Sequence, residues 1–166
     1  MKSDWEVANE GRFLRDESDA AGVVPPASPR REDLVRVEVP YANGFAFLVD
    51  PKSVSVGKDR IVRYALVARS PSGVDNVSYE GMSCAAAEFA VYAIGLADGK
   101  WRTIAPQWKP IERKGTQRWH GTLYDDYFCP GGSTIAEAAD GVAALKAGGN
   151  PFARRGAVLP SGPSGR

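Results

Sequence analysis

The stretch that decides the fold runs from residue 61 to residue 82 and reads IVRYALVARSPSGVDNVSYEGM. Its first nine residues are rich in β-branched and aromatic side chains, which favour extended structure. Residues 70–73 (SPSG) then supply the residue types of a tight turn, and a second run of strand-forming residues begins at Val74. This pattern predicts a hairpin of two long strands.

Shorter runs on either side of this hairpin extend the predicted sheet. Residues 34–39 alternate between apolar and polar side chains, and residues 45–49 follow the turn-forming Asn-Gly pair at residues 43–44. These two runs are therefore predicted to pair as a second hairpin. Further strands are predicted at residues 53–56, 87–95 and 101–104. The alanine-rich start of the run at 87–95 leaves a helix open there as an alternative.

After the last predicted strand, the spacing of apolar residues changes to that of helices. Trp119, Leu123 and Tyr127 are four residues apart, as neighbours on one helix face are. A last helix is predicted to begin at residues 134–137 (TIAE), which match a capping box, and to stop before Gly148. The sequence thus predicts an α+β fold, in which an antiparallel sheet of about five to six strands is packed by one or two C-terminal helices.

The net charge of +1 conceals an uneven distribution along the chain. Residues 1–33 carry five basic and eight acidic side chains, residues 34–147 carry thirteen and twelve, and residues 148–166 carry three and none. We therefore expect an acidic, proline-containing arm, a single globular domain, and a basic, disordered tail rich in Gly and Pro. The apolar residues of the arm that could dock on the domain are Trp5, Phe13 and Leu14.

Several classes of function conflict with the composition. The balanced charge of the predicted domain argues against a nucleic-acid-binding protein, which carries a basic excess. No run approaches the roughly eighteen apolar residues of a membrane span. We find no glycine-rich phosphate loop or metal-ligand motif and expect no cofactor. Residues 1–6 (MKSDWE) lack the apolar core of a signal peptide, so the chain is interpreted as cytosolic or as a mature exported chain with an added Met.

The two cysteines, Cys84 and Cys129, leave two interpretations open. Neither has a second Cys or a His at the spacing of a zinc site. The pair is therefore either two buried reduced thiols or one disulfide that ties the end of the central hairpin to the second half of the domain.

His120 is the only histidine and the one weak candidate for a catalytic residue. Acyl transfer requires a nucleophile and an orienting group beside the histidine, and no Gly-x-Ser-x-Gly motif occurs. The simpler interpretation is that His120 is a polar residue on a helix or is packed against Tyr124. Asp125 and Asp126 are interpreted as a solvated charge pair rather than as a metal site.

Two further groups of residues suggest weak binding sites. Trp101, Trp108 and Trp119, together with Arg118, could line an aromatic and basic groove for a glycan or a peptide, although closely spaced tryptophans are more often part of a core. Residues 131–134 (GGST) precede the last predicted helix and could hold an anion there, but they lack a lysine to complete a phosphate site. Simple helix capping is the favoured interpretation for them.

The sequence from Arg63 to Cys84 resembles the cryptic neisserial protein one-like family, and NVSYEGM at residues 76–82 is the most specific part. Other segments match in the same order along the chain, namely residues 47–50, 53–57, 92–95, 98–101 and 127–130, with Trp108 and His120. The resemblance covers about residues 34–150. Members of this family resemble exported envelope proteins of Gram-negative bacteria, often with a signal peptide or a lipoprotein leader, and no biochemical role is established for them.

The resemblance implies that Cys84 and Cys129 form a disulfide, because such bonds persist in oxidising compartments. It also implies a location in the periplasm or on the periplasmic face of the outer membrane, where a leader absent from this sequence could carry a lipid anchor. We therefore expect a non-enzymatic envelope domain that binds an envelope protein or a cell-wall or lipid-derived ligand. The alternative is an envelope hydrolase or transferase that uses His120, although the resemblance assigns no catalytic residue.

Overall fold

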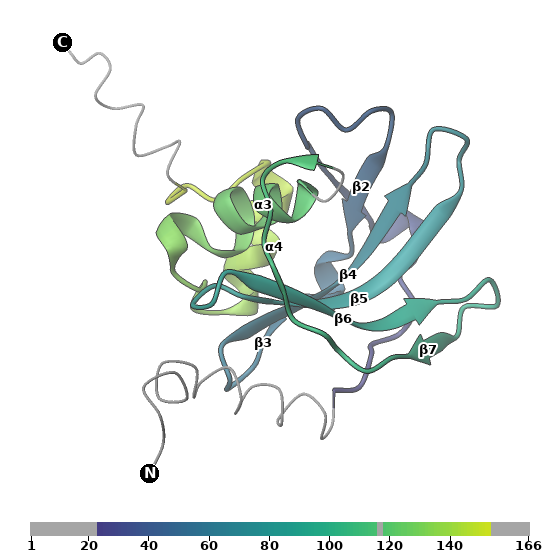
Figure 1. Cartoon of the computed structure of the whole chain (residues 1–166), viewed down its shortest axis with the longest axis horizontal. Coiled ribbons are helices and arrows are strands. Elements are labelled where there is room, and N and C mark those ends of the chain that lie inside the picture. Colours follow the sequence, from purple (N-terminus) through teal and green to yellow (C-terminus); the bar gives the residue numbers. More distant parts are fainter. Residues whose placement is uncertain (1–22, 116–117, 154–166) are drawn as a thin grey trace.

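A computed structural model of the chain describes residues 23–115 and 118–153 (Figure 1). The predicted docking of Trp5, Phe13 and Leu14 lies outside the described residues. Two residues outside the predicted domain of residues 34–147, Pro26 and Asn150, form hydrogen bonds with it. The indole of Trp101 donates a hydrogen bond of 2.7 Å to the Pro26 carbonyl. The backbone N–H of Asn150 donates one of 2.7 Å to the Asp126 carbonyl.

Eight strands of the described residues form one antiparallel sheet. They are β1 (Val35–Val37), β2 (Ala46–Val49), β3 (Ser55–Val56), β4 (Ile61–Arg69), β5 (Asp75–Ser83), β6 (Glu88–Gly95), β7 (Trp101–Thr103) and β8 (Lys109–Pro110). The order across the sheet is β1-β2-β4-β5-β6-β7, with β3 beside β4 and β8 beside β6. The predicted antiparallel sheet is therefore confirmed. It has eight strands rather than five to six, and its two shortest strands, β3 and β8, have two residues each.

The central hairpin forms as the sequence predicts. β4 and β5 pair over nine residues, from Ile61 opposite Ser83 to Arg69 opposite Asp75. The turn between them is closed by the Ser70 hydroxyl, which accepts a hydrogen bond from the Val74 amide at 3.0 Å. The run at 87–95 is a strand rather than a helix, since it forms β6 and pairs with β5.

The helical layer follows the sheet in sequence. α3 (Trp119–Leu123) continues without a break into a turn of π-helix, η4 (Tyr124–Phe128), and the last helix is α4 (Ala138–Ala147). α4 ends at Gly148, which adopts a left-handed conformation with φ of 80°. Three short 3-10 turns complete the described structure, namely η1 (Arg31–Asp33), η2 (Pro51–Ser53) and η5 (Pro130–Gly132).

The predicted start of the last helix is wrong. Glu137 is the N-cap of α4, and its side chain forms the capping box with Asp140 rather than with Thr134. Ile135 explains the shift, because its amide donates to the Phe128 carbonyl and its carbonyl accepts from the Arg60 guanidinium, both outside α4. Residues 131–134 therefore neither cap α4 nor lie at its N-terminus.

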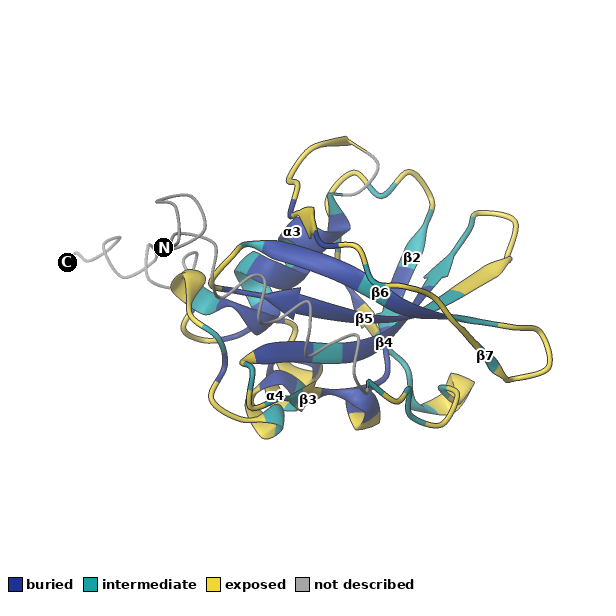
Figure 2. Ribbon diagram, turned by 60° about the horizontal axis from the view of Figure 1, so that its bottom comes forward, coloured by how far each residue is buried: buried dark blue, intermediate teal, exposed yellow. Residues whose placement is uncertain are grey.

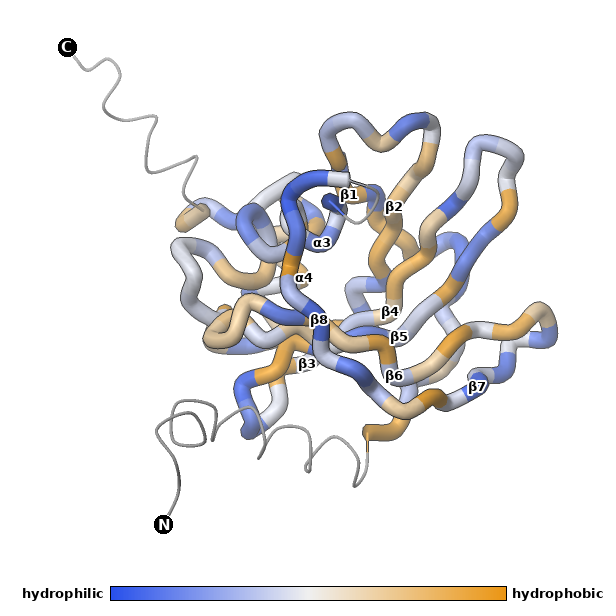
Figure 3. Tube along the Cα trace, viewed as in Figure 1, coloured by the Kyte–Doolittle hydropathy of each residue, from blue (hydrophilic) through white to orange (hydrophobic). Residues whose placement is uncertain are grey.

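The two faces of the sheet carry two separate hydrophobic clusters. Successive side chains of a strand point to opposite faces, so Tyr64 and Leu66 face the helices whereas Ile61 and Ala65 face away from them. The helix-facing cluster contains Phe128 of η4 as well. The middle of β4, β5 and β6 is buried, while β7 and the turns are largely exposed (Figure 2). β2 and β4 are hydrophobic along most of their length (Figure 3).

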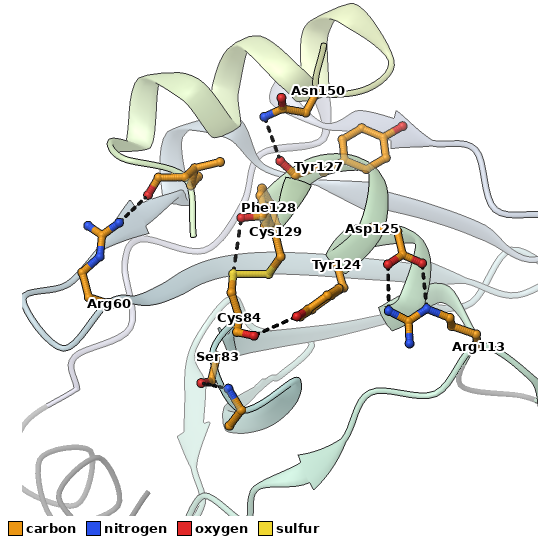
Figure 4. The surroundings of a disulfide bond; sticks show 12 residues. Arg60, Ser83, Cys84, Arg113, Tyr124, Asp125, Tyr127, Phe128, Cys129 and Asn150 are labelled. Carbon is orange, nitrogen blue, oxygen red and sulfur yellow. Dashed lines mark hydrogen bonds and ion pairs between the residues drawn. A yellow bond between two sulfur atoms is a disulfide. The ribbon is translucent and has the colours of Figure 1, made fainter. Parts of the chain in front are cut away.

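A disulfide between Cys84 and Cys129 joins the sheet to the helical layer (Figure 4). Cys84 follows β5 directly, Cys129 follows η4, and their Cα atoms are 5.4 Å apart. Both cysteines are buried. The Tyr124 hydroxyl donates a hydrogen bond of 2.7 Å to the Cys84 carbonyl at the same junction. The expected disulfide is therefore confirmed.

Removing this disulfide is expected to destabilise the fold strongly. The bond spans a sequence separation of 45 residues, and the chain-entropy model assigns a loop of that size roughly 4 kcal/mol. We expect the double variant Cys84→Ala/Cys129→Ala to lose an amount of this order from its free energy of unfolding in urea. Reduced wild-type protein is the control and should lose a similar amount. Equal stabilities of the oxidised wild type and the double variant would show that the bond contributes nothing.

Candidate functional site

A cavity of about 580 Å³ lies against the helix-facing side of the sheet. It extends from the loop between β1 and β2, across β2, β4, β5 and β6, to the start of α3. Its walls are mainly apolar and include Phe45, Phe47, Leu66, Val77, Val91 and Ile94. The volume falls within the range of pockets that bind small molecules in proteins, about 300–1,000 Å³.

Two ionisable side chains, Glu80 and His120, line this cavity and are almost completely buried, with exposed fractions of 3% and 1%. Glu80 Oε1 lies 3.0 Å from His120 Nε2 and 3.2 Å from the Tyr64 hydroxyl. Glu80 Oε2 accepts a hydrogen bond of 2.7 Å from the Ser78 hydroxyl. Three hydrogen-bonding partners from two strands and a helix thus surround one carboxylate, as a buried charge requires.

The His120 ring is held between two aromatic rings. Phe89 stacks on it with ring centroids 3.5 Å apart, and the Trp119 centroid lies 3.5 Å away as well. The second ring nitrogen, Nδ1, has no hydrogen-bond partner among the described residues. Leaving such a buried polar atom without a partner costs about 1–3 kcal/mol, so a ligand or a water that bonded to it would recover free energy.

Tyr64 remains a hydrogen-bond donor in this network. Its burial, and then the charge of Glu80, raise the pKa of the Tyr64 phenol well above its ordinary value. The hydroxyl is therefore protonated at neutral pH and donates to Glu80.

Two further charged side chains of opposite sign, those of Arg118 and Asp75, line the cavity. Arg118 lies 5.3 Å above the ring centroid of Tyr41, a largely exposed residue. Asp75 pairs with Arg69 at 2.7 Å, and the hydrogen bond from that guanidinium lowers the pKa of Asp75. The charge of Asp75 is thereby balanced by that of Arg69, whereas the guanidinium of Arg118 donates a hydrogen bond to the carbonyl of Gly115.

The tryptophans of the suggested groove are distributed over both faces of the sheet. Trp119 lines the cavity beside Arg118 and His120. Trp108 packs edge-on against Tyr92 on the opposite face, with centroids 6.4 Å apart, and Trp101 packs near Tyr79 at 6.2 Å. The structure therefore does not bring the three tryptophans together in one groove.

Of the acidic pair Asp125 and Asp126, Asp125 forms an ion pair with Arg113. Asp125 forms two hydrogen bonds, of 2.8 and 2.7 Å, with the guanidinium of Arg113 (Figure 4). Among the described residues, no group of three or more His, Cys, Asp or Glu side chains is placed to hold a metal ion. In the same part of the chain, no helix is long and apolar enough to cross a membrane.

Glu80, the centre of the buried network, is not among the candidate residues that the sequence suggests. The alternation of side chains along β5 indicates a buried position, because Glu80 lies on the same face of this strand as the fully buried Met82. A carboxylate on the buried face of a central strand needs partners from elsewhere in the fold. His120 is one of them, and only the folded chain brings these two positions together.

The chemistry of the Glu80–His120 pair is that of a proton carrier. A His–Glu pair can hold and move a proton, but nucleophilic catalysis also needs a nucleophile within reach of the histidine. The hydroxyl of Ser78 donates a hydrogen bond to Glu80, and the sulfur atoms of both cysteines are bonded to each other in the disulfide.

Comparison with known proteins agrees with the resemblance seen in the sequence. The model of the CNP1-like family matches residues 15–146, so it begins within the predicted acidic arm and includes Glu80 and His120. No curated protein and no solved structure matches the chain.

Tyr64→Phe is expected to lower the free energy of unfolding by about 1.5–3 kcal/mol, the range for a hydrogen bond to a charged group. The variant keeps the ring and removes only the hydroxyl that Glu80 accepts from. Tyr41→Phe makes the same chemical change at an exposed ring and should stay within about 0.5 kcal/mol of wild type. Equal effects of the two variants in urea denaturation would contradict the network.

The effect of Tyr64→Phe is also expected to depend on pH. The pKa of Tyr64 is raised in the folded protein, so its contribution to stability is complete below the pKa of an unfolded tyrosine and is lost as the pH rises toward the folded value. The stability difference between wild type and Tyr64→Phe should therefore shrink above about pH 10. A difference that stays constant from pH 8 to pH 11 would show that Tyr64 ionises as easily in the folded as in the unfolded chain.

Proposed function

The chain belongs to the CNP1-like family, and on that premise we propose that it is a non-enzymatic binding domain of the cell envelope whose cavity holds a small apolar ligand. One observation carries this proposal, namely a mainly apolar cavity that is also lined by the buried and hydrogen-bonded pair of Glu80 and His120. A few well-placed polar groups in an otherwise apolar pocket are the usual composition of a small-molecule site.

The chemistry of the walls favours a lipid-derived ligand over a sugar or a peptide. Side chains such as Phe47, Leu66 and Val91 offer no hydrogen bonds to a polar ligand. Burying an apolar ligand against them releases about 25 cal/mol for each Å² removed from water. A glycan would instead leave many hydroxyls without partners in this cavity, which is unfavourable.

The envelope location is part of the same proposal. The disulfide between Cys84 and Cys129 supports it, because structural disulfides form and persist in oxidising compartments such as the periplasm. We place the protein in the periplasm or on the periplasmic face of the outer membrane, held there by a lipid anchor if its leader is of the lipoprotein type. An envelope protein that delivers or receives the ligand is then its expected partner.

A specific observation keeps an enzymatic alternative in view, since His120 and Glu80 form a hydrogen-bonded pair inside a cavity. In that alternative the protein is an envelope hydrolase or transferase in which His120 acts as a general base. It requires turnover of an acyl substrate, such as a p-nitrophenyl ester, that is lost in His120→Asn. The binding proposal requires no turnover by either protein.

Filling the cavity is expected to abolish ligand binding. We expect the neutral fluorescent probe N-phenyl-1-naphthylamine to bind the wild type with increased emission, and Ala68→Trp, which places a large ring in the cavity, to weaken binding about tenfold or more. Ala143→Trp adds the same side chain at an exposed position of α4 and is the matched control.

The outcome distinguishes a cavity site from a surface site. Equal affinities of the wild type and Ala68→Trp would place the probe elsewhere and remove the basis of the proposal. Thermal denaturation of each variant verifies that Ala68→Trp is folded. If that variant is unfolded, Val91→Phe offers a smaller change in the same wall.

A further inference from the structure

We infer that the ligand is a neutral apolar molecule with a single hydroxyl group, such as a long-chain alcohol, and that this hydroxyl donates a hydrogen bond to Nδ1 of His120. The inference rests on the proposed function, since it names the ligand class for the same cavity. It follows from which atoms of the Glu80 network carry protons, from the surroundings of the His120 ring and from the charges near it.

The hydrogen bonds of Glu80 indicate which ring nitrogen of His120 carries a proton. An ionised carboxylate only accepts hydrogen bonds, so each of its partners must donate. Tyr64 and Ser78 donate through their hydroxyls, and His120 must therefore carry a proton on Nε2. In the neutral imidazole the other nitrogen, Nδ1, is then a lone-pair acceptor.

The protein itself offers that acceptor no donor. Phe89 and Trp119 pack against the two sides of the ring, and Glu80 occupies the Nε2 edge. His120 is 1% exposed, and its Nδ1 has no partner among the described residues. Because His120 lines the cavity, a molecule in the cavity is the available source of a donor.

The charge of Glu80 selects a neutral ligand over an acid. A carboxylate at the His120 end of the cavity would lie near the carboxylate of Glu80, which is 3.0 Å from the same imidazole ring, and like charges repel strongly in a buried site. The guanidinium of Arg118, a described residue that also lines the cavity, stacks on the exposed ring of Tyr41. An acid would therefore be drawn to Arg118 and would leave Nδ1 unpartnered, whereas an alcohol satisfies it.

The first experiment reads the protons of His120 directly. His120 is the only histidine of the chain, so a two-bond ¹H–¹⁵N correlation spectrum of labelled protein contains a single imidazole. We expect the Nε2–H tautomer in the wild type and a shift of the Nδ1 resonance when 1-decanol is added. In Glu80→Gln the side-chain amide can donate to Nε2, so we expect the opposite tautomer, with the proton on Nδ1. Glu112→Gln changes an exposed glutamate and should leave the tautomer as in the wild type.

The second experiment measures ligand preference by displacement of N-phenyl-1-naphthylamine. One hydrogen bond distinguishes 1-decanol from 2-decanone, which has no donor, so the wild type and Glu112→Gln should bind the alcohol about three- to tenfold more tightly. Glu80→Gln should abolish this preference, because the Nδ1–H of His120 would donate equally to the oxygen of the ketone and to that of the alcohol. Decanoic acid should bind the wild type more weakly than 1-decanol.

The possible results separate this inference from the proposed function. Equal binding of alcohol and ketone by the wild type, or an Nδ1–H tautomer in it, overturns the inference while probe binding in the cavity still supports the proposed function. Tighter binding of decanoic acid than of 1-decanol overturns it as well. If the probe does not bind and none of the other compounds binds either, the proposed function fails. The wild-type measurements decide the inference even if Glu80→Gln does not fold.

Discussion

The buried carboxylate of Glu80 is the constraint on which the arrangement of this domain depends. Its three partners come from β4, β5 and α3, so satisfying one charge fixes the helical layer against the centre of the sheet. Hydrophobic packing alone is tolerant of small shifts between layers, whereas three hydrogen bonds on two oxygen atoms are not. Glu80, Ser78 and His120 also line the cavity, and the interaction that positions α3 therefore also determines the chemistry offered to a ligand.

The sheet was predictable because its signals are local. Alternation of side chains and the SPSG turn define the hairpin of β4 and β5, and both depend only on neighbouring residues. The start of α4 was not predictable in the same way. Thr134 and Glu137 match a capping box, but contacts of Ile135 with Phe128 and with Arg60 hold that segment outside the helix. Long-range contacts of this kind override a local pattern.

The candidate site was predictable only in part, for a related reason. His120, Trp119 and Arg118 are neighbours in sequence and lie together at the cavity. Trp101 and Trp108 lie on the other face of the sheet, and the spacing of the tryptophans contained no information about which face each would occupy. Glu80 reads as an ordinary polar strand residue until its pairing with a histidine forty residues later is known.

The disulfide and the cavity lie toward opposite ends of the central hairpin, and this separation has a consequence. Cys84 follows the end of β5 that pairs with Ile61, whereas Asp75 and Asn76 at the other end line the cavity. The helical layer is therefore attached to the hairpin in two chemically different ways, by a covalent bond beyond one end of β5 and by the hydrogen bond between Glu80 and His120 at the cavity. Reduction can break the first attachment and only a change of protonation or a competing hydrogen bond the second.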